Sequence, residues 1–132
     1  MILLDTHVLV WLWTGDSHLG KSARRMMDVA LRDQELAVSA MAFWEVAMLR
    51  NRGRLDFTED VGLWRRELLG QGLAEIPVDG EIGIRANALP GFHADPADRI
   101  IVSTALEGHQ LLTADAGILQ WSGDLNRLDA RE

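Results

Sequence analysis

The stretch MILLDTHVLVWLW (residues 1–13) places one carboxylate, Asp5, between two apolar runs. The first run, Ile2 to Leu4, is brief, apolar and closed by a polar residue, which predicts a buried strand. The second run starts at Thr6 and predicts a short helix that ends near Gly15. We therefore expect Asp5 to lie where the chain leaves a sheet and enters a helix.

The composition is that of one globular domain. The chain has 132 residues, of which 48% are apolar, and it contains no cysteine. Disorder and a disulfide scaffold are excluded on these grounds, and a reducing compartment is expected. The N-terminus lacks the pattern of a signal peptide, and no apolar run approaches the roughly 18 residues of a membrane span. We expect a cytoplasmic protein with no membrane association.

The formal net charge of -7 opposes binding of nucleic acid through a generally basic surface. It leaves open an enzyme acting on nucleic acid whose acids hold metal ions, because bound cations reverse the local field.

Strand and helix patterns alternate along the whole chain, without repeats or linkers. Strands are expected at 2–4, 35–38, 73–78, 110–113 and, as an edge strand, 125–128. Helices are expected at 6–14, 21–33, 40–51, 58–72, 80–89 and 95–107, with a short one after Asp115. Ser39 and Thr58 are expected N-caps, and Asp95-Pro96 is an N-cap followed by proline at the first helical position. This order predicts a three-layer α/β domain with a parallel sheet of four or five strands flanked by helices.

Ligands of open α/β sheets bind beyond the carboxyl ends of the strands, so the acids at those ends are the candidate site residues. Each also has a structural explanation. Asp5 and Asp115 suit helix N-termini, and the N-cap to N3 spacing of Asp95 and Asp98 suits a pair that caps a helix. For Asp95 we keep that structural interpretation. The candidates at this edge are Asp5, Glu45, Asp98 and Asp115.

Glu45 is the acid that a structural role explains least well. It shares a helix face with Met41, Met48 and Leu49, and Arg50 is poorly placed to pair with it. A carboxylate on such a face is costly unless it is paired or bound to a cation. Four carboxylates at one edge would repel one another, and an all-oxygen set without cysteine suits Mg²⁺ or Mn²⁺ better than Zn²⁺.

Five segments in this order resemble PIN-domain ribonucleases of the VapC toxin type, from bacterial type II toxin–antitoxin systems. They are LLDTHVLVWL (3–12), VSAMAFWEVAML (38–49), GRL (53–55), LPGFHADPADRIIVSTAL (89–106) and LLTAD (111–115). The resemblance covers nearly the whole chain, and it implies a single PIN domain over residues 1–132.

The resemblance also implies the roles of particular residues. The metal-binding catalytic acids would be Asp5, Glu45, Asp98 and Asp115, with Asp5 and Asp98 innermost and Asp115 the least secure as a direct ligand. Thr113 would support the pocket with its hydroxyl, and Ser39 would donate a hydrogen bond to a residue that binds the metal. Arg99 would contact phosphate or pair with a structural acid. Mg²⁺ or Mn²⁺ held there would activate water to attack an RNA phosphodiester.

The partners implied are an RNA substrate, a cognate antitoxin whose C-terminal segment crosses the acidic cleft, and a second copy of the chain in a homodimer. Local basic patches around RNRGR (50–54) are expected either to guide RNA or to form solvated helix faces. The histidines His7 and His93 are expected at the surface or in packing. Most tryptophans are expected in the core, with an interface or base-stacking role open for some.

Other functions stay open. A PIN-fold RNA-processing enzyme or DNA nuclease is the main enzymatic alternative. A receiver-like signalling module fits poorly, because Asp5 stands alone after the first strand and Lys21 is the only lysine. A haloacid-dehalogenase-like phosphatase would require Asp-x-Asp where the chain has Asp5-Thr6-His7.

Overall fold

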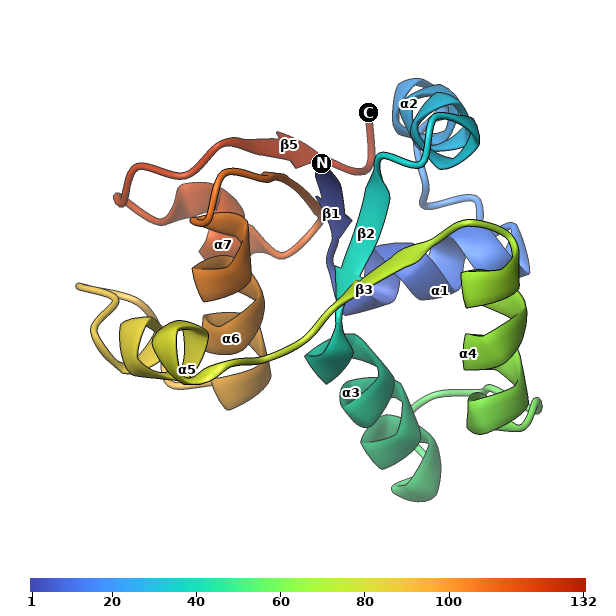
Figure 1. The fold of residues 1–132 in the computed structure, drawn as a ribbon, viewed down its shortest axis with the longest axis horizontal. Helices are drawn as coiled ribbons and strands as arrows, with labels where there is room; N and C mark the ends of the chain where they lie inside the picture. Colours follow the sequence, from blue (N-terminus) through green and yellow to red (C-terminus); the bar gives the residue numbers. More distant parts are fainter.

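A computed structural model describes residues 1–132, the whole chain, as a five-stranded parallel sheet between two layers of helices (Figure 1). The strands lie in the order β3-β2-β1-β4-β5. Their bounds are β1 (Ile2–Leu4), β2 (Leu36–Ser39), β3 (Ala74–Ile76), β4 (Gln110–Thr113) and β5 (Arg127–Asp129). The predicted fold class and strand number are confirmed.

The helices are α1 (Thr6–Thr14), α2 (Lys21–Arg32), α3 (Ala40–Asn51), α4 (Val61–Gly70), α5 (Gly80–Asn87), α6 (Pro96–Ala105) and α7 (Ala116–Gln120). In Figure 1, α1 and α4 lie on one side of the sheet and α5, α6 and α7 on the other. No helix is both long enough and apolar enough to span a membrane.

Two apolar cores hold the layers together, because alternate residues of each strand point to opposite faces. Leu4, Val38 and Leu112 face the core shared with α1 to α4, in which Trp64 is 1% exposed. Leu3 and Leu111 face the core shared with α6 and α7. The strands are consequently apolar on both faces, as expected of a buried parallel sheet.

The sheet has a topological switch point beside its central strand. Leu4 of β1 is paired with Val38 of β2 on one side and with Leu112 of β4 on the other. The chain runs outward from β1 to β2 and β3, then returns to add β4 and β5 on the opposite side. The residues that follow β1 and β4 therefore lie at the position where α/β sheets bind ligands.

Most predicted helix caps are correct and one is wrong. Ser39, Asp95 and Asp115 cap α3, α6 and α7 with their side chains. Thr58 does not cap α4. The helix starts three residues later, where the Asp60 carboxylate accepts the N–H of Leu63 at 2.9 Å. Both residue types are good N-caps, so the local pattern does not choose between them.

Several predicted boundaries differ from the structure by one to three residues, among them those of the third and fifth strands. The third strand is limited to Ala74–Ile76, because Pro77 has no N–H to continue the ladder. The fifth strand lies at Arg127–Asp129, two residues later than expected at its start, where Leu128 pairs with Leu112. Among the tryptophans, Trp64 is in the core as expected, whereas Trp44 is 57% exposed.

Candidate metal centre

Asp5 lies between β1 and α1 and is held by the ends of both central strands. Asp5 is only 6% exposed. Oδ1 accepts the N–H of Thr6 at 2.8 Å and so caps α1, and Oδ2 accepts the Thr113 hydroxyl at 2.7 Å. Burial raises the pKa of the carboxyl, while the Thr113 and Thr6 hydrogen bonds oppose that rise.

Thr113 connects Asp5 to Asp115. The buried hydroxyl, while donating to Asp5, accepts the N–H of Asp115 at 3.0 Å. Asp115 in turn caps α7, because its Oδ2 accepts the N–H of Ile118 at 2.9 Å. The side chain of Asp115 is 42% exposed, so it forms the open rim of the site rather than its floor.

Glu45 is buried, as its helix face predicted. It is 8% exposed, and its pKa is raised first by burial and then by repulsion from Asp5 and Asp95. The hydroxyl of Thr6 opposes this rise. That hydroxyl is buried, but it makes no hydrogen bond of good geometry within the protein. A buried hydroxyl without a partner beside a buried carboxylate is a place for a bound water or ligand.

Asp98 is the centre of the cluster. Burial, followed by repulsion from Asp5, Asp95, Asp115 and Glu45, raises its pKa to about 8. Its ligand oxygen lies in two groups of three side chains whose ligand atoms are all within 4.8 Å of one another. One group adds Glu45 and Asp95, and the other adds His93 and Asp115.

His93 and Asp95 were not expected to join the site. Nε2 of His93 lies 3.4 Å from Oδ2 of Asp98 and 3.9 Å from Oδ2 of Asp115. The predicted packing role of His93 is also present, because its ring stacks on Phe92 at 4.3 Å between centroids. Asp95 caps α6 as predicted, accepting the N–H groups of Ala97 and Asp98. The sequence signal was the spacing H-A-D-P-A-D, which brings three ionisable side chains to one helix start.

With this geometry established, the family follows from comparison with known proteins. The sequence model of the PIN domain family matches residues 2–122 of the chain. The chain belongs to the PIN domain family. Ribonuclease VapC22 of Mycobacterium tuberculosis is 34% identical to this PIN domain over 116 residues, which are 86% of each chain.

Solved structures show the same PIN fold. A toxin–antitoxin complex from Klebsiella pneumoniae matches with a TM-score of 0.64 at 21% identity, covering 98% of both chains. The VapBC2 complex of Rickettsia felis, bound to a DNA fragment from its promoter, matches with a TM-score of 0.67 at 15% identity. That match covers 97% of this chain and 98% of the other. At these identities the two likenesses establish the fold alone.

Two residues predicted to support the site make hydrogen bonds that the sequence did not predict. Arg99 makes no ion pair with an acid. Its guanidinium donates to the carbonyls of His93, Phe92 and Ala86 at 2.8, 2.8 and 2.9 Å, and so fixes the loop before α6. Ser39 caps α3 by accepting the N–H of Met41 at 3.1 Å, and it makes no hydrogen bond to a carboxylate.

The donor set fits a hard divalent cation. The pKa values of Asp5, Glu45 and Asp98 are raised first by burial and then by repulsion between neighbouring carboxylates. PIN nucleases generally use a divalent metal, and a cation here would relieve that repulsion. Of the four predicted ligands, Glu45, Asp98 and Asp115 belong to the two groups of converging ligand atoms, whereas Asp5 is in neither group.

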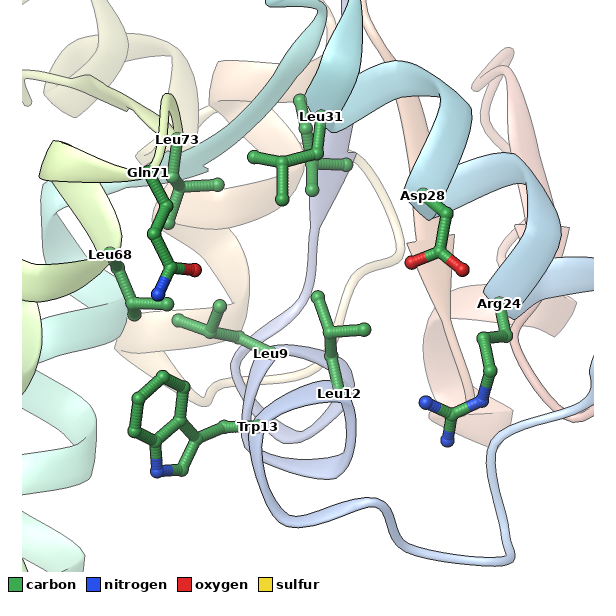
Figure 2. A pocket seen from close by; sticks show the side chains of 10 residues that line it. Leu9, Leu12, Trp13, Arg24, Asp28, Leu31, Leu68, Gln71 and Leu73 are labelled. Carbon is green, nitrogen blue, oxygen red and sulfur yellow. The ribbon is translucent and has the colours of Figure 1, made fainter.

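A cavity of about 280 Å³ lies elsewhere in the protein, and none of these acids lines it (Figure 2). It lies between α1, α2 and α4, and seven of its ten lining residues are apolar, among them Leu9, Leu12 and Leu68. Arg24, Asp28 and Gln71 are its polar members. An apolar cavity without converging ionisable groups does not provide hydrolytic chemistry, so we place the chemistry at the acids.

Proposed function

We propose that this chain is a metal-dependent endoribonuclease that acts as the toxin of a type II toxin–antitoxin pair. The observation that carries the proposal is the position of Asp98, whose carboxyl is shared by two groups of potential ligands at the switch point of the sheet. The 34% identical relative is a ribonuclease, and the structural neighbours include toxin–antitoxin complexes. The relative supports the activity, and the toxin–antitoxin neighbours support the setting.

In this proposal Asp5 and Asp98 are the innermost ligands of Mg²⁺ or Mn²⁺, and Glu45 and Asp115 complete the site. When bound, the cation would activate water and offset charge on the phosphodiester under attack. Thr113 holds Asp5 as a fixed acceptor through its 2.7 Å hydrogen bond. Burial of Asp5 and Glu45 keeps bulk water away, which strengthens every electrostatic interaction in the site.

RNA is the proposed substrate, and local basic groups are the proposed guide for it. Residues 50–54 are all exposed, and Arg52 and Arg54 have no carboxylate within ion-pair distance. Arg50 is less free, since its Nε donates to the carbonyl of Phe57 at 2.9 Å. With a net charge of -7, affinity should come from this patch and from the bound cation rather than from the whole surface.

The proposed partners are a cognate antitoxin and a second copy of the chain, in the cytoplasm. A basic side chain of the antitoxin placed in the acidic cluster would pair with Asp98 and its neighbours and exclude the cation. Such a contact explains inhibition without unfolding, because it supplies the positive charge that the buried acids lack.

The test is cleavage of structured RNA by the purified chain in EDTA, Mg²⁺ or Mn²⁺, compared with the Asp98→Asn variant. Asp33→Asn is the matched control, because Asp33 is exposed at the C-terminal end of α2. We expect metal-dependent cleavage by wild type and control, a loss of at least about a hundredfold in Asp98→Asn, and weak activity on double-stranded DNA. Expression of the chain alone should arrest growth, and Asp98→Ala should relieve the arrest. Equal cleavage by Asp98→Asn and wild type would contradict the proposal, and preferred cleavage of DNA would favour the DNA-nuclease alternative.

A further inference from the structure

A small cavity of about 200 Å³ opens directly beside the metal centre. Its lining residues are Asp5, His7, Trp11, Ala114 and Asp115. Two of these, Asp5 and Asp115, are predicted ligands, so the cavity adjoins the acidic cluster. The other three come from one face of α1 and from the turn after β4.

The walls of this cavity carry aromatic and polar side chains. His7 and Trp11 are four residues apart and so lie on the same helix face. Val8, Leu9 and Val10 are buried in the core on the other faces. His7 is exposed and Trp11 is half-buried, and the indole N–H of Trp11 donates to no acceptor within the protein. Trp11 packs in part against the core, whereas its indole N–H and the exposed His7 have no role in that packing.

One face of the Trp11 ring is stacked on a second ring, which holds its orientation. The imidazole of His18 stacks on it at 5.4 Å between centroids, with an interplanar angle of 24°. Asp16 fixes His18 in turn, since its Oδ1 lies 2.6 Å from Nδ1 and accepts the backbone N–H of His18 at 2.8 Å. A ring that is already oriented loses little entropy when a flat ligand stacks against it.

We propose that this cavity binds the base of an unpaired nucleotide next to the cleaved phosphate, stacked against Trp11. The proposal rests on the proposed ribonuclease function and names its substrate more closely. Asp115 belongs to one group of potential ligands and also lines this cavity, so a phosphate bound through a cation there would have its adjoining nucleotide beside the cavity. Stacking on an aromatic ring is available to every base, and Ala114 is small enough to leave room for one.

A base within a duplex already stacks on its neighbours and pairs across the helix, so it cannot place its face on Trp11 without being extruded. The test of the Trp11 contact therefore uses an RNA in which the nucleotide beside the cut is unpaired.

The experiment compares KM and kcat for a loop-containing RNA among four proteins: wild type, Trp11→Leu, Trp11→Phe and Trp44→Ala. Trp11→Leu keeps apolar bulk and removes the ring, Trp11→Phe keeps a ring, and Trp44 is an exposed tryptophan outside the cavity. Thermal unfolding of each protein checks the fold. We expect KM to rise about 5- to 150-fold in Trp11→Leu, to rise much less in Trp11→Phe, and to stay unchanged in Trp44→Ala.

A second substrate makes the test independent of folding effects. RNA with an abasic residue beside the cut should raise KM of the wild type as much as Trp11→Leu does. Combining the abasic RNA with Trp11→Leu should raise KM little beyond either change alone, because each removes the same stacking contact.

Full additivity of the two changes, or an unchanged KM in Trp11→Leu, would overturn the subsite while leaving the ribonuclease proposal intact. Unchanged cleavage with lost inhibition by the antitoxin would also overturn it and would assign the ring to a protein interface. Failure of the wild type to cleave any RNA would overturn both proposals together.

Discussion

The hydroxyl of Thr113 donates a 2.7 Å hydrogen bond to Oδ2 of Asp5, joining residues 108 positions apart in the chain. The sheet itself produces this contact, because Leu4 of β1 and Leu112 of β4 are register partners and the two residues follow them directly. The same hydroxyl accepts the N–H of Asp115. One side chain thus aligns an acid on each side of the switch point.

The Thr113→Val variant tests whether the hydrogen bonds of Thr113, rather than its packing, align the two acids. Valine has nearly the same shape but cannot donate to Asp5 or accept from Asp115. A buried carboxylate oxygen and an N–H would lose their partner, which should lower the free energy of unfolding by about 1–3 kcal/mol. The pKa of Asp5, already raised by burial, should rise further, and metal affinity should fall.

Thr113→Ser is the control, because serine keeps the hydroxyl and loses only a methyl group. Urea unfolding and Mg²⁺ titration of both variants would check the prediction. Equal losses in the valine and serine variants would mean that the methyl group, rather than the hydrogen bond, stabilises the site.

The stability of the metal-free protein should fall as the pH rises. The pKa values of Asp5, Glu45 and Asp98 are all raised in the folded state. In the interval between the unfolded and folded pKa, the folded protein holds a proton that the unfolded chain has released. For Asp98 this interval runs from its ordinary value of 3.8 to about 8. Each such group should reduce the free energy of unfolding by about 1.4 kcal/mol per pH unit there.

Urea unfolding in EDTA between pH 5 and pH 8.5 measures this slope. Mg²⁺ should flatten it, and stabilisation by Mg²⁺ should grow with pH because protons compete for the same oxygens. Asp98→Asn, which cannot ionise, should have a shallower slope in EDTA than the wild type. If the variant and the wild type have the same slope, Asp98 is not protonated in the metal-free fold.

The sheet and the acid cluster were predictable because both depend on local patterns. Short apolar strands separated by helices specify a parallel sheet, and the carboxyl ends of parallel strands meet at one edge. Asp5, Asp98 and Asp115 therefore converge once their strands and helices are assigned. Glu45 could be added because a carboxylate on an apolar helix face needs a reason to be there.

The remaining features depend on contacts that no local pattern contains. Arg99 binds carbonyl oxygens, which every residue has, so its three partners carry no signature in the sequence. Asp60 rather than Thr58 caps α4, although both residues suit that position. The spacing of His93 and Asp98 is local, but the 3.4 Å approach of their side chains also depends on the loop conformation that Arg99 fixes.

Arg99→Lys should reduce stability as well as activity. A lysine offers one ammonium group where the guanidinium now meets three carbonyls, so at least one acceptor would lose its donor. We expect the free energy of unfolding to fall by about 1–3 kcal/mol, with a loss of cleavage that follows loosening of the loop carrying His93. Arg66→Lys, at an exposed position of α4, is the control. A raised KM for RNA at unchanged melting temperature would instead indicate that Arg99 contacts phosphate.

Gly117, in the first turn of α7, is where the acid cluster leaves least room. A Cβ at this position would lie 3.0 Å from Cδ2 of His93 and 3.1 Å from Oδ2 of Asp115. Both contacts are tighter than ordinary van der Waals separation, so the two side chains would have to move. Glycine here allows His93 to approach Asp115.

Gly117→Ala should therefore reduce activity without reducing stability. Alanine favours a helix over glycine by up to about 1 kcal/mol, which offsets the cost of moving two partly exposed side chains. A displacement of a few tenths of an ångström at a ligand should nevertheless lower metal-dependent cleavage by about three- to tenfold. Gly83→Ala in α5 is the matched control, since no atom lies within 4 Å of the added Cβ there. Melting temperatures, Mg²⁺ titrations and cleavage rates of both variants would be compared. Equal cleavage by both variants would show that the distance between His93 and Asp115 does not matter for the reaction, whereas a lower melting temperature in Gly117→Ala alone would show that the added methyl group strains the fold.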